Sequence, residues 1–161
     1  MFRLSKLTDY GIVLLAQLAR APGDRPQNAR ELALRAELPV PVVSKVLKLL
    51  ARGEVLESRR GAHGGYALAR PAHRISVAAV IDALEGPVAI TECARGPSLC
   101  SHEVTCAVRD PIHVLNDVVN KALSTISLAD LIDPQFGTMS DLGTTLQILD
   151  QGDSPRSNAT E

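Results

Sequence analysis

Aromatic side chains are nearly absent from this chain of 161 residues, which has two Phe, two Tyr and no Trp. Hydrophobic residues still make up 45% of the sequence, so a core can form, and that core must be aliphatic. Proteins that bind single-stranded nucleic acid stack unpaired bases on aromatic rings. The composition therefore argues against that class of binding.

Long hydrophobic runs and a disulfide framework are also missing. No apolar run approaches the roughly 18 residues that a membrane-spanning helix needs, and the first residues lack the pattern of a secretory signal. We therefore expect a cytoplasmic protein with no membrane contact. The chain has three cysteines, an odd number, and the cytoplasm is reducing, so structural disulfides are not expected.

The net charge of −1 hides a strong asymmetry between the two halves of the chain. Residues 1–74 hold 13 Lys and Arg against 6 Asp and Glu, a net charge of +7. Residues 75–161 hold 4 against 12, a net charge of −8. This pattern predicts one half that binds a polyanion and another half with a different role.

The basic half has the pattern of a winged helix-turn-helix over residues 1–86, a mainly α fold with a small β-hairpin. Apolar spacing predicts helices over 4–20, 28–38 and 41–52, and Ser76 begins a fourth that ends before Gly86. Asn28 and Glu31 form a capping-box pattern, and Gly53 closes the third helix. Two short strands, 55–60 and 66–69, flank a glycine-rich turn that forms the wing.

The third helix is the candidate recognition helix, because one face can be buried while the other enters the major groove of double-stranded DNA. Its apolar face consists of Val43, Val46, Leu47 and Leu50. The residues left outside are Pro41, Val42, Ser44, Lys45, Lys48 and Arg52. Ser44 and Lys45 lie in the first turn and can reach base edges, whereas Lys48 and Arg52 suit phosphates. The wing offers Arg59, Arg60 and His63 to the DNA backbone or the minor groove.

Residues 87–110 form a segment without clear periodicity that holds all three cysteines, Cys93, Cys100 and Cys106. A loop can fold three thiolates around one centre, and thiolates suit iron or zinc. Structural zinc would need a further ligand such as His102 or His113, and the Cys-x2-Cys pairs of zinc ribbons are missing. Three unconnected thiols are the remaining alternative.

The region after the cysteines predicts a long dimerisation helix within residues 111–135, opened by Pro111. Its apolar residues recur at heptad-like spacing: Ile112, Leu115, Val119, Ala122 and Ile126. We expect Leu115, Val119 and Ala122 to line the seam of a homodimer, and the polar residues 136–161 to be disordered. No nucleophile paired with a base and no phosphate loop is visible, so an enzyme is not expected.

The combined pattern resembles the IscR/NsrR family of winged-helix iron–sulfur transcriptional regulators. The matching segments span roughly residues 1–132: Leu4 to Tyr10, Val43 to Leu50, Ser58 to Arg70, Glu85-Gly86-Pro87, the three cysteines, and Ser127 to Leu131. The start and the wing look most like the proteobacterial regulator of the SUF cluster-assembly operon. The resemblance implies a homodimeric repressor that binds an operator under the control of a cluster held by Cys93, Cys100 and Cys106.

The resemblance also bears on the type of cluster. The branch with a [2Fe–2S] centre has a histidine three residues after the last cysteine, where this chain has Arg109. The branch with a [4Fe–4S] centre takes a carboxylate from the first helix of the partner subunit, and Asp9 matches it. A [4Fe–4S] cluster with Asp9 as fourth ligand is therefore favoured over [2Fe–2S]. An acid that merely stabilises the helix start is the alternative for Asp9, and His102 and His113 are rival ligands.

Two other functions remain open. One is a winged-helix repressor whose cysteine loop holds structural zinc or senses redox state without metal. The other is a nitric-oxide-sensing member of the same family.

Overall fold

The computed structural model describes residues 4–21, 25–61, 64–95 and 106–136. Among the predicted site residues, His63, Cys100 and the rival ligand His102 lie outside these ranges, as does the predicted tail from residue 137 onward. The elements, in chain order, are α1 (Lys6–Ala19), α2 (Ala29–Ala36), α3 (Val40–Arg52), β1 (Leu56–Arg59), β2 (Gly65–Leu68), a short 3-10 helix η1 (Ala72–Arg74), α4 (Val77–Glu85), α5 (Glu92–Arg95), α6 (Arg109–Thr125) and α7 (Leu128–Ile132).

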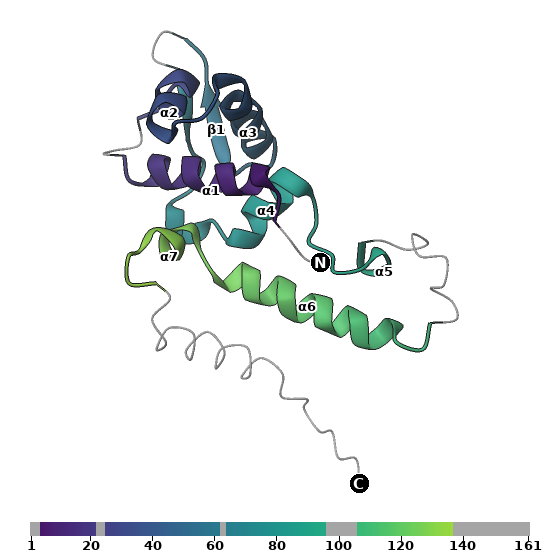
Figure 1. Ribbon diagram of the computed structural model, residues 1–161. Helices are drawn as coiled ribbons and strands as arrows, with labels where there is room; N and C mark the ends of the chain where they lie inside the picture. Colours follow the sequence, from purple (N-terminus) through teal and green to yellow (C-terminus); the bar gives the residue numbers. More distant parts are fainter. Residues whose placement is uncertain (1–3, 22–24, 62–63, 96–105, 137–161) are drawn as a thin grey trace.

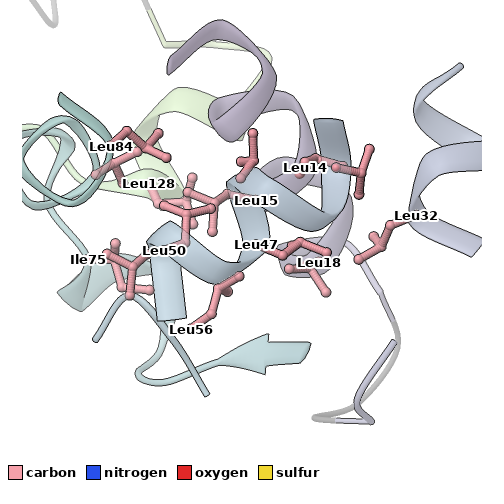
Figure 2. Packing of buried hydrophobic residues seen from close by; sticks show 14 of the residues in the cluster. Leu14, Leu15, Leu18, Leu32, Leu47, Leu50, Leu56, Ile75, Leu84 and Leu128 are labelled. Carbon is pink, nitrogen blue, oxygen red and sulfur yellow. The ribbon is translucent and has the colours of Figure 1, made fainter. Parts of the chain in front are cut away.

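The first four α-helices and the hairpin enclose one aliphatic core. Leucines from α1 and α3 lie at its centre, and Leu32, Leu56 and Ile75 close it from α2, the hairpin and the chain before α4. Figure 2 shows these side chains converging from different elements. The chain thus folds as the predicted winged helix-turn-helix, with an antiparallel β1–β2 hairpin whose register pairs Leu56 with Leu68 and Arg59 with Gly65.

The helices begin where side chains can cap them. Ser5, Asn28 and Ser76 each accept a hydrogen bond from a backbone N–H in the first turn of α1, α2 and α4. These caps satisfy donors that have no partner inside the helix. The predicted starts at Asn28 and Ser76 are confirmed, whereas α1 begins at Lys6, two residues after its predicted start at residue 4.

Gly53 has a different role from the predicted one. It ends α3 with φ −83°, and the left-handed residue is the next one, Glu54, with φ 57°. A Cβ on Gly53 would overlap the side chain of Ala83 and lie 2.9 Å from its Cα. Glycine is therefore needed here because α3 and α4 approach closely, and its conformational freedom is not used.

The region predicted as one dimerisation helix, 111–135, is two helices with different surroundings. The chain leaves α6 at Ile126 and pairs with the residues before α4: Val77 N donates to Ile126 O (2.9 Å), and Leu128 N donates to Ile75 O (2.7 Å). Leu128, 1% exposed, then enters the core beside η1 and α1. Helix α7 therefore packs with the basic half of the chain, although it follows the cysteine segment in sequence.

Helix α6 lies on the opposite side of α1 from α2, α3 and the wing (Figure 1). It contacts α4 and, near its beginning, α5. The predicted cysteine segment 87–110 is therefore not irregular throughout, because it contains α5 and the first two residues of α6. In the ranges that the structure describes, no helix is long and apolar enough to span a membrane.

Candidate functional site

Helix α3 has one buried face and one exposed face, as the sequence predicts. Val43, Val46, Leu47 and Leu50 are completely buried. Pro41, Lys45, Lys48 and Arg52 are exposed, and Val42 and Ser44 are half-buried. Three cationic side chains therefore lie along the solvent face of a helix whose other face is fixed in the core. Such a helix presents its outer residues in a defined geometry, as a reader of base edges requires.

The turn before α3 sets the direction of that face. Helix α2 ends at Glu37, which adopts the left-handed conformation (φ 54°), and its N–H and the N–H of Leu38 return to α2 carbonyls. Pro39, in an extended conformation, then directly precedes α3. This tight turn makes α2 and α3 a helix-turn-helix.

The wing is fixed to the body of the domain by an isolated β-bridge between Gln27 and Tyr66. Gln27 and Tyr66 exchange two backbone hydrogen bonds, both 2.9 Å long. Gly65 lies directly against Gln27, where a Cβ would be 2.5 Å from the carbonyl oxygen. The glycine is thus required for this bridge. Arg59 and Arg60 are exposed at the end of β1, and Arg59 pairs with Glu57 at 2.5 Å.

Two of the three cysteines lie in described residues. Cys93 is in α5 and Cys106 lies just before α6, and both are free, half-buried thiols. The Oγ1 of Thr91 lies 3.1 Å from the Sγ of Cys93. Because α5 contacts α6, both thiols belong to one corner of the molecule. Within the described ranges, no three His, Cys, Asp or Glu side chains come together as a metal site.

Two asparagines on α6 hold the chain that leads to α5, and sequence reasoning missed both. Asn116, only 7% exposed, accepts a hydrogen bond from Ile90 N (3.1 Å). Asn120 donates from Nδ2 to Val88 O (3.1 Å). Two amides four residues apart on a helix share one face, and this spacing beside the apolar stripe was the available signal.

His113 lies on the same face of α6, one turn before Asn116. Residues 88 and 90 pair with Asn120 and Asn116, so this segment runs antiparallel to α6. Helix α5, which carries Cys93, contacts α6, which carries His113. The Nε2 of His113 is buried and has no hydrogen-bond partner among the described residues.

Glu85, the last residue of α4, joins the cysteine segment to the start of α1. Its carboxylate accepts hydrogen bonds from Ser5 N (2.9 Å) and from the hydroxyl of the buried Thr8. Partial burial acts to raise the pKa of Glu85, but the hydrogen bonds from Thr8 and Ser5 outweigh it and hold the pKa below its ordinary value of 4.5. Asp9 follows Thr8 and is exposed in the first turn of α1, so it faces outward from the chain.

Comparisons with known proteins agree with this architecture. The Rrf2 family, described as iron-dependent transcriptional regulators, matches residues 4–134. Protein rrf2 of Nitratidesulfovibrio vulgaris is 30% identical over 81% of this chain and 87% of its own length. The transcriptional repressor NsrR of Streptomyces coelicolor is also 30% identical, over 84% of this chain and 91% of its own length.

Solved structures show the same fold. CymR, the global cysteine regulator of B. subtilis, superposes with a TM-score of 0.63 at 25% identity, over 82% of this chain and 97% of its own. IscR of T. potens superposes with a TM-score of 0.57 at 24% identity, over 97% of this chain and 94% of its own. These relatives are transcriptional regulators and not enzymes. The chain belongs to the Rrf2 family of DNA-binding transcriptional regulators.

Proposed function

We propose that this regulator is a cytoplasmic homodimeric repressor of a SUF cluster-assembly operon, and that it senses an iron–sulfur cluster bound by Cys93, Cys100 and Cys106. The observation that carries the DNA-binding part is the division of α3, whose cationic residues are exposed over a completely buried apolar stripe. The wing adds Arg59 and Arg60 to the cationic surface. Guanidinium and ammonium groups bind phosphates and release counterions, which drives association with double-stranded DNA.

The residues of α3 contact different parts of the DNA, according to their position along the helix. Ser44 and Lys45, near the beginning of α3, contact base edges in the major groove, and Pro41 and Val42 contact the groove beside them. Lys48 and Arg52, further along α3, contact phosphates, as do Arg59, Arg60 and His63 of the wing. Substitution of Ser44 should change which operator is preferred, whereas Lys48→Ala should weaken all duplexes alike.

The dimer seam lies on the exposed face of α6. Val114, Leu115 and Val118 are 63%, 48% and 50% exposed, which is a large apolar surface for one helix. Of the predicted seam residues, Leu115 is in this group, whereas Val119 and Ala122 are half-buried in the single chain. Two copies that pair through this face bury the patch and give two linked readers for a two-fold operator.

The cysteine segment has donors that suit iron. Cys93 and Cys106 are half-buried thiols at one corner, and thiolate is a preferred ligand of iron–sulfur clusters. When bound, a cluster supplies a removable covalent link between the two ends of this segment. Asp9 of the partner subunit is our proposed fourth ligand, which favours [4Fe–4S] over [2Fe–2S]. His113 is the second candidate, because its buried Nε2 has no described hydrogen-bond partner.

The described contacts offer a route from this segment to the DNA-reading half. Residues 88 and 90 are held by Asn120 and Asn116, and Glu85 joins the same stretch of chain to Ser5 and Thr8 of α1. Order in the cysteine segment thus biases the position of α1 relative to α6, and so the spacing of two reading heads across the dimer. Operator and cluster then select the same conformation and raise each other's affinity.

The test is anaerobic purification followed by absorbance, iron and sulfide analysis and gel shifts of the holo and apo forms on the native promoter. We expect a coloured protein whose operator affinity falls on cluster loss, and Cys93→Ser, Cys100→Ser and Cys106→Ser variants that lose most iron. Ser101→Ala, in the same segment, is the control and keeps the iron. Equal affinity of holo and apo protein would refute the sensor mechanism while leaving the DNA-binding assignment intact.

The same preparation separates the alternatives. A colourless protein with one zinc per chain would establish a structural metal, and one without metal would establish redox sensing by thiols. Loss of operator binding on nitric oxide exposure, with no response to iron limitation, would establish the nitric-oxide-sensing alternative. A labile cluster in Asp9→Ala with a stable one in His113→Ala supports Asp9, and the reverse result assigns the site to His113.

A further inference from the structure

A pocket at the base of the wing brings together three arginines that are far apart in sequence. Its volume is about 440 Å³, and it lies between the C-terminal end of α1 and the β1–β2 hairpin. Arg25 comes from the segment before α2, Arg59 from β1 and Arg70 from the segment after β2. All three are exposed residues that line the opening, while Leu18 and the buried Ala67 line the pocket among apolar neighbours.

The charge of this pocket is positive. Glu57 is the one carboxylate among its lining residues, and it pairs with Arg59 at 2.5 Å. No salt bridge is found for Arg25 or Arg70 within the described residues, which exclude Asp24. Three arginines against one carboxylate leave an excess of positive charge around the pocket, which favours the binding of an anion. A guanidinium group binds phosphate through two parallel hydrogen bonds, which is why arginine is favoured at phosphate sites.

We propose that this pocket binds a phosphate group of the DNA backbone next to the groove that the wing enters. The proposal rests on the proposed DNA-binding function and adds Arg25 and Arg70 to the interface. The hairpin register places Arg59 opposite Gly65, at the end of the hairpin that carries Arg60 and the turn. The pocket is therefore continuous with the wing surface. Phosphate contacts fix the register of a protein on the duplex without reading its sequence.

The experiment measures binding of a fluorescent operator duplex by anisotropy over a range of salt concentrations. Each neutralised phosphate contributes a slope of about −0.9 to the plot of log affinity against log salt, so one phosphate per subunit contributes about −1.8 in a dimer. The double variant Arg25→Ala/Arg70→Ala should flatten the slope by roughly this amount. Arg70→Ala alone should weaken binding of specific and non-specific duplexes about tenfold alike.

Arg74→Ala is the matched control, because Arg74 is an exposed arginine close to Arg70 that does not line the pocket. It should bind like wild type. Arg70→Lys keeps the charge but loses the paired donors, so it should restore only part of the affinity. Unchanged thermal midpoints of all variants show that they are folded.

The outcomes separate this proposal from the proposed function. Wild-type protein that shows no salt-dependent operator binding would refute the function itself. Normal wild-type binding and a weakened Lys48→Ala, with pocket variants equal to Arg74→Ala, would refute the pocket alone. Inorganic phosphate at constant ionic strength should compete with DNA in wild type more than in the double variant. Phosphate that binds the pocket by calorimetry without weakening DNA binding would show a site for a free anion and overturn the DNA assignment.

Discussion

The two halves of this molecule are each stabilised by a different kind of interaction. The DNA-reading half buries leucines and valines from five helices and the hairpin in one core. Helix α6, with 17 residues, has Asn116 as its buried residue, and polar contacts from Asn116 and Asn120 hold it to residues 88–90. A packed core resists small displacements, whereas a few hydrogen bonds can be exchanged. The reader is therefore stiff and its attachment to the cysteine segment is adjustable.

Replacing a leucine by alanine in each half should give the largest difference between the two halves in the effect on stability. Leu47→Ala leaves a cavity in the completely buried core and should lower the free energy of unfolding by about 2–5 kcal/mol. Leu115→Ala, on the exposed face of α6, should instead shift the equilibrium from dimer toward monomer. The free energy of unfolding of the dissociated subunit should stay the same within about 0.5 kcal/mol. Chemical denaturation at several protein concentrations measures both. Equal losses that do not depend on concentration would contradict the comparison.

A smaller loss is expected at the contact between α3 and α4. Gly53→Ala forces a methyl group into Ala83 and should cost about 1–3 kcal/mol of stability. Ala83→Gly removes the opposing methyl group, so the double variant should recover part of that loss. A double-mutant cycle by thermal denaturation measures the coupling energy between the substitutions at Gly53 and Ala83. Additive effects of the two changes would show that the helices have room to separate.

These cases mark where sequence reasoning succeeds and where it ends. The buried stripe of α3 and the caps at Asn28 and Ser76 were predictable, because helix periodicity and capping depend on residues within a few positions. The partners of Gly53, Asn116 and Leu128 are remote in sequence and depend on tertiary packing. The half-burial of Val119 and Ala122 in the single chain was not predicted for the same reason, since the side of α6 that faces Ile90 cannot be found from α6 alone.

One substitution should weaken the contact between α6 and residues 88–90 without disturbing the core. Asn116→Ala removes the acceptor of the Ile90 N–H, and leaving a buried donor without a partner costs about 1–3 kcal/mol. Hydrogen exchange should therefore speed up at the Ile90 amide by about tenfold or more, while exchange in α3 stays the same. Ser124→Ala, which removes an exposed hydroxyl on the same helix, serves as control. Faster exchange across α3 as well would show that the halves unfold together.

The smallest effect concerns the dependence of stability on pH. The pKa of Glu85 is below 4.5 in the folded protein, so its carboxylate stabilises the fold above the unfolded-state pKa. That contribution is lost as the pH falls through 4.5 and then through the lower folded-state pKa. Glu85→Gln should remove this part of the acid sensitivity, as measured by denaturation between pH 3 and about 6. Glu85→Gln in a Thr8→Val background should change the pH profile less, because Thr8 is one of the donors.

The pairing of residues 75–77 with 126–128 has a consequence for how such regulators diversify. The intervening chain departs from the reader and returns to it at adjacent positions, joined by hydrogen bonds of 2.7 and 2.9 Å. The entropic cost of closing a flexible loop grows only with the logarithm of its length, about 0.6 kcal/mol for each doubling. Insertions, deletions or a wholly different ligand-binding segment between Gly86 and α6 would therefore leave the two anchor points, and the helix-turn-helix that they support, in place.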